Sequence, residues 1–292
     1  MLFLFHKLHG LGNDFVLIDG TQTDCQNFED CLTPKLIRQW GDRHTGIGFD
    51  QLLVLQQDQH KGEQQWQLQF YNSDGSAAKQ CGNGLRACAL WLHRQGHFGA
   101  LKETPDSTIN VKTEGGLIAL SVLSSDADQP QYCVDLPAPK MVGAIQDYKY
   151  PARFEQAQAV NVGNPHLIIL CDDPEQQRKQ LGADLVNDQC LFDTLDSEIP
   201  LFGSGCNISF VDYKSRPVKL FVWERGAGPT RACGSAACAV AAVLSTLSNV
   251  DPERGLEIVQ PGGSLMLKYI NEKTLRMSGS ATYVYSGTIS TN

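Results

Sequence analysis

The chain contains one motif twice, and this internal repeat limits the folds open to it more than any other feature. Residues 72–92 read NSDGSAAKQCGNGLRACALWL, and residues 224–244 read ERGAGPTRACGSAACAVAAVL. In each copy a polar residue stands nine positions before a Cys-Gly pair, and an apolar stretch follows that pair. The copies lie 152 residues apart in a chain of 292 residues. This length suits two domains or one large one, and the repeat predicts two similar domains.

The stretches after both Cys-Gly pairs have helical spacing. Leu85, Cys88 and Leu92 recur on one face of the first predicted helix, and Gly96 is expected to end it. The second stretch, from Ser235 to Leu247, carries no charged residue. We expect a helix of this kind to be buried on nearly every side, which requires strands around it.

Strand patterns supply those surroundings. Many short apolar or alternating segments and few helices predict an α+β fold. A break is expected near Ser124–Pro130, where polar residues and proline replace apolar ones. The predicted strands are Phe15–Ile18, Gln51–Leu55, Gln67–Tyr71, Ile109–Lys112, Leu117–Val122, Gln158–Val162, His166–Leu170, Asn207–Tyr213, Val218–Trp223, Glu257–Gln260, Leu265–Tyr269, Thr274–Ser278 and Ala281–Tyr285.

Charge and composition exclude several function classes. The formal net charge is −8, with 24 Lys and Arg against 32 Asp and Glu, and no basic cluster occurs. We therefore expect neither nucleic acid nor an anionic membrane surface as a partner. No apolar run is long enough to span a membrane. A small molecule is the expected ligand.

Cysteine usage and the missing motifs narrow the chemistry further. The ten cysteines form no CxxC pair and are irregularly spaced, which indicates reduced thiols in the cytoplasm. The Gly-x-Gly pieces lack the third glycine of a dinucleotide site. His93 and His97 have the spacing of zinc ligands, but Gly96 lies between them and the glutamate of a zinc protease is missing. We expect no metal and no dinucleotide site.

A cysteine at the start of a helix is well placed for proton transfer. The first turn leaves backbone N–H groups unpaired and carries partial positive charge, which favours a thiolate and a bound carboxylate. A glycine after the cysteine lets a ligand approach those N–H groups closely. A single cysteine is more often a buried structural thiol, but Cys81 and Cys233 occur in matched settings.

Two such thiols suit racemisation. If the domains face each other across a pseudo-twofold axis, Cys81 and Cys233 point into a shared cleft from opposite sides. Inversion at a carbon needs a base on one face and an acid on the other. The N–H groups of the two helix starts would stabilise the charge that develops on the substrate carboxylate.

The chain also resembles a known family. The strings HGLGNDFVLID (9–19), RHTGIGFDQLL (43–53), NSDGSAAKQCGNGLRA (72–87), NVGNPHLI (161–168), ERGAGPTRACGSAACA (224–239) and GSATYVYSG (279–287) closely resemble the diaminopimelate epimerases. The resemblance spans the chain and includes both cysteine motifs in order. It implies a cofactor-independent isomerase that interconverts LL- and meso-diaminopimelate, a precursor of lysine and of the cell wall.

The resemblance implies a fold and a domain division. Each of two pseudo-symmetric domains is expected to be a mostly antiparallel, barrel-like sheet around a central helix. The first domain would comprise residues 1–122 plus 279–292, because the last strand returns to complete it, and the second residues 123–278. The family also implies a cytoplasmic homodimer.

Residue roles follow from the resemblance position by position. Cys81 and Cys233 resemble the two acid/base thiols, and the sequence leaves open which of them is the thiolate at rest. Glu224 would keep the reacting amine as an ammonium, and His166 and Glu224 resemble the groups that tune the thiols. The reacting carboxylate would lie at Gly82, Asn83, Gly234 and Ser235. The distant amino-acid end would be recognised by Asn72, Asn164, Asn207 and Arg225, with Asn13 and Gln51 completing the polar lining.

Three positions depart from the family pattern: Phe49, Pro229 and Ala236 stand where the family usually has a smaller, an acidic and a glycine residue. None is a proposed proton-transfer group. A disulfide between Cys81 and Cys233 that locks the oxidised enzyme off is a further hypothesis.

Other functions stay open at this point. A proline or hydroxyproline racemase of the same architecture is the nearest, although Arg225 and the asparagines suit a second amino-acid head. A non-catalytic module in which the cysteines sense oxidants is another. A cysteine hydrolase is a third, but it would leave the duplicated motif without a purpose.

Overall fold

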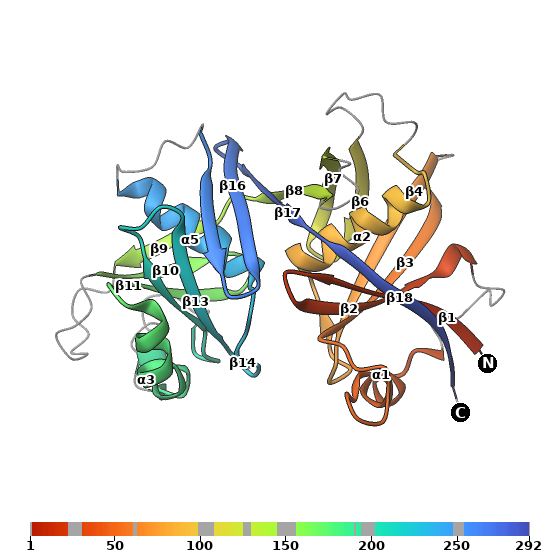
Figure 1. The fold of residues 1–292 in the computed structure, drawn as a ribbon, viewed down its shortest axis with the longest axis horizontal. Coiled ribbons are helices and arrows are strands. Elements are labelled where there is room, and N and C mark those ends of the chain that lie inside the picture. Colours follow the sequence, from red (N-terminus) through yellow and green to blue (C-terminus); the bar gives the residue numbers. More distant parts are fainter. Residues whose placement is uncertain are drawn as a thin grey trace. The chain divides into compact units, whose positions relative to one another are not determined.

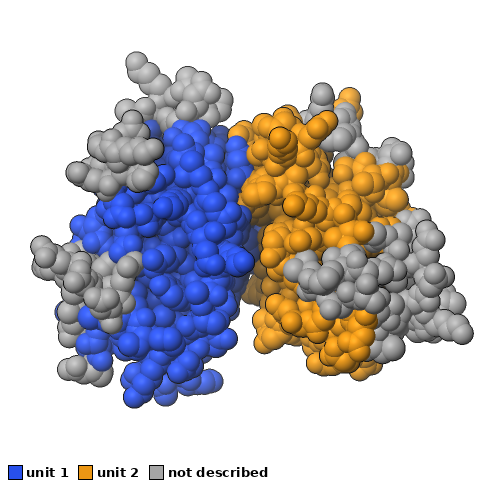
Figure 2. Space-filling view, turned by 180° about the vertical axis from the view of Figure 1, so that it is seen from behind, with its two compact units in different colours: residues 1–135, 278–292 blue, residues 136–277 orange. Residues whose placement is uncertain are grey.

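The structure is a computed structural model, and it describes residues 2–22, 31–60, 63–98, 108–124, 130–144, 156–189, 191–193, 202–247 and 254–291. The chain divides into two compact units, coloured in Figure 2. Unit 1 comprises Met1–Asp135 and Ser278–Asn292, and unit 2 comprises Leu136–Met277. Both units consist of a sheet with few helices, which confirms the predicted α+β class.

Unit 1 is built on a mostly antiparallel sheet with the strand order β18, β1, β2, β3, β4, β6, β7, β8. Its β2–β3 and β4–β6 pairs are parallel. The strands are β1 (Leu2–Gly10), β2 (Asn13–Asp19), β3 (Gln51–His60), β4 (Glu63–Asn72), β5 (Ala77–Ala78), β6 (Thr108–Thr113), β7 (Gly116–Ser124), β8 (Gln131–Pro137) and β18 (Thr282–Ser290).

Helix α2 (Gly82–Arg94) lies at the centre of unit 1 (Figure 1). It contacts β1, β2, β3, β7 and β18, which are distributed across the sheet. Leu85, Cys88 and Leu92 are fully buried, as their spacing predicts. Gly96 follows the helix with φ +78° and donates its N–H to the carbonyl of His93, which is typical of a helix end.

Unit 2 repeats this arrangement. Its strands pair in the order β9, β10, β11, β12, β13, β15, β16, and β11–β12 and β13–β15 are again the parallel pairs. The strands are β9 (Lys140–Ala144), β10 (Gln156–Asn161), β11 (Pro165–Leu170), β12 (Asn207–Asp212), β13 (Val218–Glu224), β14 (Gly228–Pro229), β15 (Leu256–Gln260), β16 (Gly263–Asn271) and β17 (Thr274–Ser280).

Helix α5 (Gly234–Thr246) is the central helix of unit 2. It contacts β9, β10, β11, β12 and β16. Residues 236–244 are all buried, including Ala239 and Val240 at 0 % exposure. The prediction of an uncharged helix surrounded by strands is therefore confirmed.

A second helix covers the outer face of each sheet. Helix α1 (Pro34–Gly41) begins at the N-cap Thr33, and its Ile37 and Trp40 pack on Val16 and Phe49 in one apolar cluster. This two-sided burial explains the continuous apolar runs of β2 and β3.

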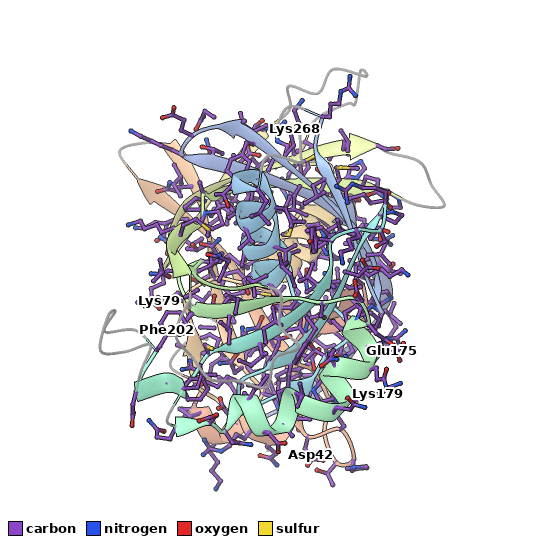
Figure 3. The ribbon with its side chains drawn as sticks, turned by 90° about the vertical axis from the view of Figure 1, so that its left-hand side faces the viewer. Asp42, Lys79, Glu175, Lys179, Phe202 and Lys268 are labelled. Carbon is purple, nitrogen blue, oxygen red and sulfur yellow. The ribbon has the colours of Figure 1, made fainter. Side chains whose placement is uncertain are left out.

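Helix α3 (Pro174–Val186) has the equivalent place in unit 2, where it contacts β12 and β13. Leu185 belongs to the apolar cluster that also contains Ile169, Phe202 and Phe210. Figure 3 labels Glu175 and Lys179, which lie one turn apart on α3 and form an ion pair of 2.8 Å.

The unit bounds differ from the expected division after residue 122. Strand β8 belongs to unit 1 up to Asp135 because it pairs antiparallel with β7. The thiol sulfur of Cys133 on β8 also lies 3.2 Å from the hydroxyl of Ser278, where the chain re-enters unit 1. The predicted break lies largely outside the described residues.

Three longer strands, β1, β8 and β9, do not appear among the predicted segments. Strand β1 pairs with both β2 and β18, so the end of the chain does complete the sheet of unit 1.

In the described part of the chain, no helix combines the length and the apolar character that a membrane crossing needs.

Candidate active site

Cys81 is the N-cap residue of α2, as its motif predicts. Its backbone is extended, with φ −143° and ψ 113°, and its carbonyl accepts the first helical bond from Leu85 N–H at 2.8 Å. The half-buried sulfur accepts a bond from Gly84 N–H at 3.4 Å. The helix start therefore supplies a donor to this sulfur.

The side chain of Asn13 faces Cys81 from the start of β2. Its Oδ1 lies 3.9 Å from the Cys81 sulfur and accepts a bond from Asn83 Nδ2 at 3.2 Å. Asn83 Oδ1 in turn accepts a bond from Nη2 of Arg86 at 3.0 Å. Arg86 is fully buried, and because a guanidinium only donates, it determines how both amides are oriented.

The other side of Asn13 is held by a carboxylate. Asn13 Nδ2 donates to Asp50 Oδ2 at 2.7 Å, and Asp50 Oδ1 accepts from Arg43 Nη2 at 2.7 Å. A carboxylate at this position only accepts, so the Asn13 oxygen is directed toward Cys81. We call Arg43, Asp50, Asn13, Asn83 and Arg86 the Cys81 network.

Asp14 extends this network away from the thiol. It pairs with Lys7 Nζ at 2.5 Å and with Arg43 Nη2 at 2.6 Å. Burial raises the pKa of this carboxyl, but the bonds from Arg43 and Lys7 outweigh burial and lower the pKa to about 2. Lys7 also donates to the carbonyl of Gly48, which joins β1 to the loop before β3.

Gln51 and Asn72 form a second polar pair in unit 1. They lie opposite each other on β3 and β4, and Gln51 Nε2 donates to Asn72 Oδ1 at 2.9 Å. Asn72 Nδ2 donates to the hydroxyl of Ser76 at 3.0 Å. Gln51 Oε1 is buried and has no partner among the described residues, so it can accept a donor from a ligand.

Cys233 is the N-cap residue of α5 and has nearly the same backbone as Cys81, with φ −127° and ψ 112°. Its surroundings differ. The residue is only 5 % exposed, its sulfur lies 3.4 Å from the hydroxyl of Ser235, and its backbone N–H donates to Gln260 Oε1 at 2.7 Å. Burial, followed by the negative charge of Glu224, raises the pKa of the Cys233 thiol well above its ordinary value.

Glu224 stands at the end of β13, in the position that Asn72 has at the end of β4. Its Oε1 accepts a bond from the hydroxyl of Thr230 at 2.5 Å. Its charge disfavours a second anion nearby, which adds to the effect of burial on the pKa of the Cys233 thiol.

His166 is fully buried on β11, and its Nε2 lies 3.1 Å from Asn164 Oδ1. Burial lowers the pKa of His166 to about 3, so the ring is neutral. Its Nδ1 is buried without a partner among the described residues. A neutral ring affects nearby groups through hydrogen bonds rather than through charge.

Asn207 and Arg225 meet at the edge of β12 and β13. Asn207 Oδ1 accepts the backbone N–H of Arg225 at 2.9 Å. The exposed Arg225 side chain is anchored by Nη1 to the carbonyls of Ser204 and Gly205, both at 3.0 Å. These bonds orient the guanidinium without using a carboxylate partner.

The structure therefore brings the predicted residues together in groups within each unit. In unit 1 it joins Cys81, Gly82, Asn83 and Asn13, and separately Gln51 and Asn72. The groups of unit 2 are Cys233, Gly234, Ser235 and Glu224; Asn164 and His166; and Asn207 and Arg225.

Five supporting residues were not predicted: Arg43, Asp50, Arg86, Thr230 and Gln260. All except Gln260 lie within the sequence strings that carry the family resemblance, so those strings were the signal that could have identified them. Gln260 was predicted only as the end of a strand.

The three departures from the family pattern have simple places. Phe49 is 1 % exposed and fills the cluster beneath α1. Ala236 is fully buried in the first turns of α5, and Pro229 pairs with Trp223 in the β13–β14 ladder.

In the described part of the chain, no cluster of three or more His, Cys, Asp or Glu residues could hold a metal ion. All eight described cysteines, Cys81 and Cys233 included, are free thiols.

Comparisons with known proteins agree with this geometry. The profile of the family described as "Diaminopimelate epimerase" matches residues 5–141 and 158–284. Diaminopimelate epimerases from Ectopseudomonas mendocina and from Pseudomonas syringae pv. tomato are each 34% identical to the chain, and each alignment covers 99% of both sequences.

Solved structures share the fold at lower identity. A phenazine biosynthesis protein of the PhzF family from Bacillus anthracis superposes with a TM-score of 0.70 at 12% identity, over 99% of both chains. A hydroxyproline epimerase from Agrobacterium vitis superposes with a TM-score of 0.68 at 13% identity, over 99% of this chain and 92% of the other. The family profile covers both copies of the repeat, and the relatives align with the chain from end to end. The chain therefore belongs to the diaminopimelate epimerase family.

Proposed function

We propose that the protein is an isomerase that interconverts LL- and meso-diaminopimelate without a cofactor, with Cys81 and Cys233 as its acid/base pair. One observation carries this proposal: the two cysteines are the N-cap residues of equivalent central helices, each followed by glycine. A fold that repeats a thiol in this setting has the parts that proton exchange at two faces of a carbon requires. The names of the relatives supply the substrate.

In the proposed reaction one thiolate removes the α-proton and the other thiol delivers its own proton to the opposite face of the carbon. The sulfur that was ionised ends protonated, and the sulfur that was protonated ends ionised. Cys233 is the thiol in the ligand-free protein because burial and Glu224 hold its proton. Substrate of one configuration therefore requires Cys81 to act first as the base.

The negative charge that develops on the substrate must be met by donors. Removal of the α-proton places charge on the carboxylate, and the N–H groups of Gly82, Asn83, Gly234 and Ser235 begin the two helices. Donors at helix starts stabilise such charge without reorganising. Glu224 would accept bonds from the substrate ammonium, which keeps the α-carbon acidic, while His166 and Glu224 tune the thiols.

The far amino-acid head of the substrate needs an acceptor for its ammonium and a donor for its carboxylate. The unpartnered Gln51 Oε1 fits the first requirement. The anchored guanidinium of Arg225 fits the second, because it can form two parallel bonds to a carboxylate. The remaining lining would come from the asparagines, namely Asn13, Asn72, Asn164 and Asn207.

Exchange of the α-hydrogen with solvent tests this function. Purified protein, free of pyridoxal phosphate, is incubated with LL- or meso-diaminopimelate in D₂O. We expect deuterium at the α-carbon and interconversion of the isomers, and loss of interconversion in Cys81→Ser and Cys233→Ser. Proline and hydroxyproline serve as alternative substrates, and exchange with these but not with diaminopimelate would reject the proposal.

We further propose a reducing, cytoplasmic location and a homodimer. The mechanism needs two reduced thiols, which the cytosol maintains. A dimer interface is supported by the exposed apolar side chains of the paired strands β1 and β18, namely Leu2, Leu4, Val284 and Tyr285. Light scattering during gel filtration measures the mass, and a monomer at micromolar concentration would contradict the dimer.

A further inference from the structure

Gln260 is a buried polar residue that the proposed reaction does not yet use. It ends β15 and is 4 % exposed. Its Oε1 accepts the backbone N–H of Cys233 at 2.7 Å in a buried hydrogen bond. Because an N–H can only donate, the atom that faces it must be the oxygen of the Gln260 amide. The orientation of this amide is therefore fixed by Cys233.

The nitrogen of the same side-chain amide is a hydrogen-bond donor that has no acceptor among the described residues. Nε2 of Gln260 is buried and has no hydrogen-bond partner among the described residues. Burial of an unpaired donor costs stability, so such groups are rare in folded proteins and call for an explanation. Nε2 lies one amide width from the atom that holds the Cys233 nitrogen, at the start of α5.

The internal repeat provides a comparison for this contact. In both units the turn after the strand donates a backbone bond to the segment before the cysteine, from Gly115 N–H to Lys79 and from Gly262 N–H to Arg231. The residue equivalent to Gln260 in unit 1 is Thr113, whose hydroxyl donates to Gly116 within its own turn. The backbone hydrogen bonds are thus shared, but among the described residues Thr113 does not form the side-chain bond to the cysteine that Gln260 forms.

We propose that Gln260 is a positioning residue for Cys233: its oxygen fixes the backbone amide at the head of α5, and its nitrogen supplies a buried donor for negative charge formed there. This inference rests on the proposed role of Cys233 in proton transfer. Such a donor stabilises the thiolate. It therefore offsets the two effects that raise the pKa of this thiol, namely burial and the negative charge of Glu224.

Two substitutions distinguish the role of the Gln260 oxygen from that of its nitrogen. Gln260→Met keeps the length of the side chain and removes both the acceptor and the donor. Gln260→Glu keeps the acceptor, and its carboxyl imitates the amide only while protonated, since the ionised form has acceptors alone. Burial raises the pKa of a carboxyl, so this change of state is expected within the working pH range.

The first readout needs no substrate. The rate of iodoacetamide labelling at Cys233, quantified by peptide mass spectrometry, is measured against pH with Cys233→Ser as the blank. We expect the labelling midpoint of Gln260→Met to move upward by about one pH unit or more. Gln260→Glu should label like wild type at low pH and fall behind as pH rises.

The second readout is epimerisation. We expect kcat to fall about tenfold in Gln260→Met with KM within twofold, and kcat of Gln260→Glu to decline with rising pH where wild type does not. Thr113→Val, at the equivalent position of unit 1, is the matched control and should leave the Cys233 midpoint unchanged. Wild-type labelling and kcat in Gln260→Met would overturn the inference, and if that variant does not fold, a wild-type pH profile in Gln260→Glu would do so. If the labelling shifts appear but wild type epimerises nothing, the proposed function fails and the positioning role stands.

Discussion

The heads of α2 and α5 share a backbone but differ in what surrounds the cysteine. Both cysteines are extended N-cap residues with ψ angles within one degree of each other. Cys81 is half-buried and faces Asn13 within a network of buried and charged donors. Cys233 is buried, with Glu224, Ser235 and Gln260 as polar neighbours.

This difference shows that a duplicated fold can place the same helix start in two different electrostatic surroundings. The repeated strands and helices give each thiol the same helix start. The side chains around the two thiols then differ in charge, because the carboxylate of Glu224 stands beside Cys233 where an amide, Asn72, has the equivalent place in unit 1. In the proposed two-base reaction one cysteine is a thiol and the other a thiolate at the start of each turnover, and a carboxylate beside only Cys233 favours that division.

Removal of either sulfur is the largest test of the comparison. Cys81→Ala and Cys233→Ala should each lower kcat/KM for epimerisation by about 10²–10⁴-fold, the usual contribution of an acid/base group. Coupled assay of meso-diaminopimelate formation measures this loss. The buried thiol Cys88 is the control, and Cys88→Ala should stay near wild-type activity. Retained activity in Cys233→Ala would contradict its role in proton transfer and leave oxidant sensing as the function of this cysteine.

The charge beside Cys233 gives the next largest effect. Glu224→Gln should lower kcat/KM by about 10- to 100-fold, because a bond to a charged group contributes about 1.5–3 kcal/mol. The labelling midpoint of Cys233 should also move to lower pH, since the carboxylate raises the pKa of this thiol. Glu257→Gln, an exposed glutamate on β15, is the matched control. An unchanged midpoint in Glu224→Gln would show that the two thiols differ for another reason.

The Cys81 network is tested by its carboxylate. Asp50→Ala removes the acceptor that orients Asn13, so kcat should fall about tenfold, the equivalent of one hydrogen bond. Labelling of Cys81 should become faster, because Asn13 loses one of the two hydrogen bonds that hold its oxygen toward the sulfur. Asp14→Asn removes a charge from the same Arg43 without touching Asn13, and it should leave Cys81 labelling near wild type. If the rate of Cys81 labelling changes equally in both variants, the change comes from the lost negative charge and not from the orientation of Asn13.

The smallest effect concerns stability at acid pH. The pKa of Asp14 is lowered to about 2 in the folded protein, below its value in the unfolded chain. Its contribution is therefore present above the unfolded pKa, near 4, and is lost as pH falls toward 2. The partly exposed partner Arg43 reduces the contribution to about 1–2 kcal/mol.

Urea unfolding between pH 2 and pH 6 measures this dependence. Asp14→Asn should lower the free energy of unfolding at pH 6 and flatten its decline toward pH 2. Asp172→Asn, which removes an exposed carboxylate paired with Lys214 rather than with Arg43 or Lys7, provides the comparison. A decline as steep as that of wild type in Asp14→Asn would contradict the assignment.

Much of this architecture follows from patterns within one segment. The Cys-Gly heads predict both central helices because helix capping is local, and the uncharged run after Cys233 predicts burial because charge cannot be buried unpaired. Strand β1 was missed because His6 and Lys7 interrupt its apolar pattern. Lys7 is buried there nonetheless, since Asp14 and the carbonyl of Gly48 pair with it.

The supporting residues of the site depend on contacts between distant segments. Gln260 meets Cys233 only through the turn that joins β15 to β16, and Asp50 meets Asn13 only because β2 and β3 are parallel neighbours. In the sequence Arg86 looks like an ordinary exposed residue of a helix, and only the packing of the sheet against that helix buries it. Sequence periodicity indicates which face is buried, but it does not identify the partner of a buried polar group.

The pairing of β1 with β18 has a consequence for synthesis of the chain. Unit 2 lies between the two parts of unit 1 in the sequence, so all of unit 2 is synthesised before β18 exists. The first strand must wait beside an open sheet edge during that time, and such an edge can pair with other chains. Nascent chains stalled before residue 282 should consequently be the most prone to aggregation and the most dependent on chaperones.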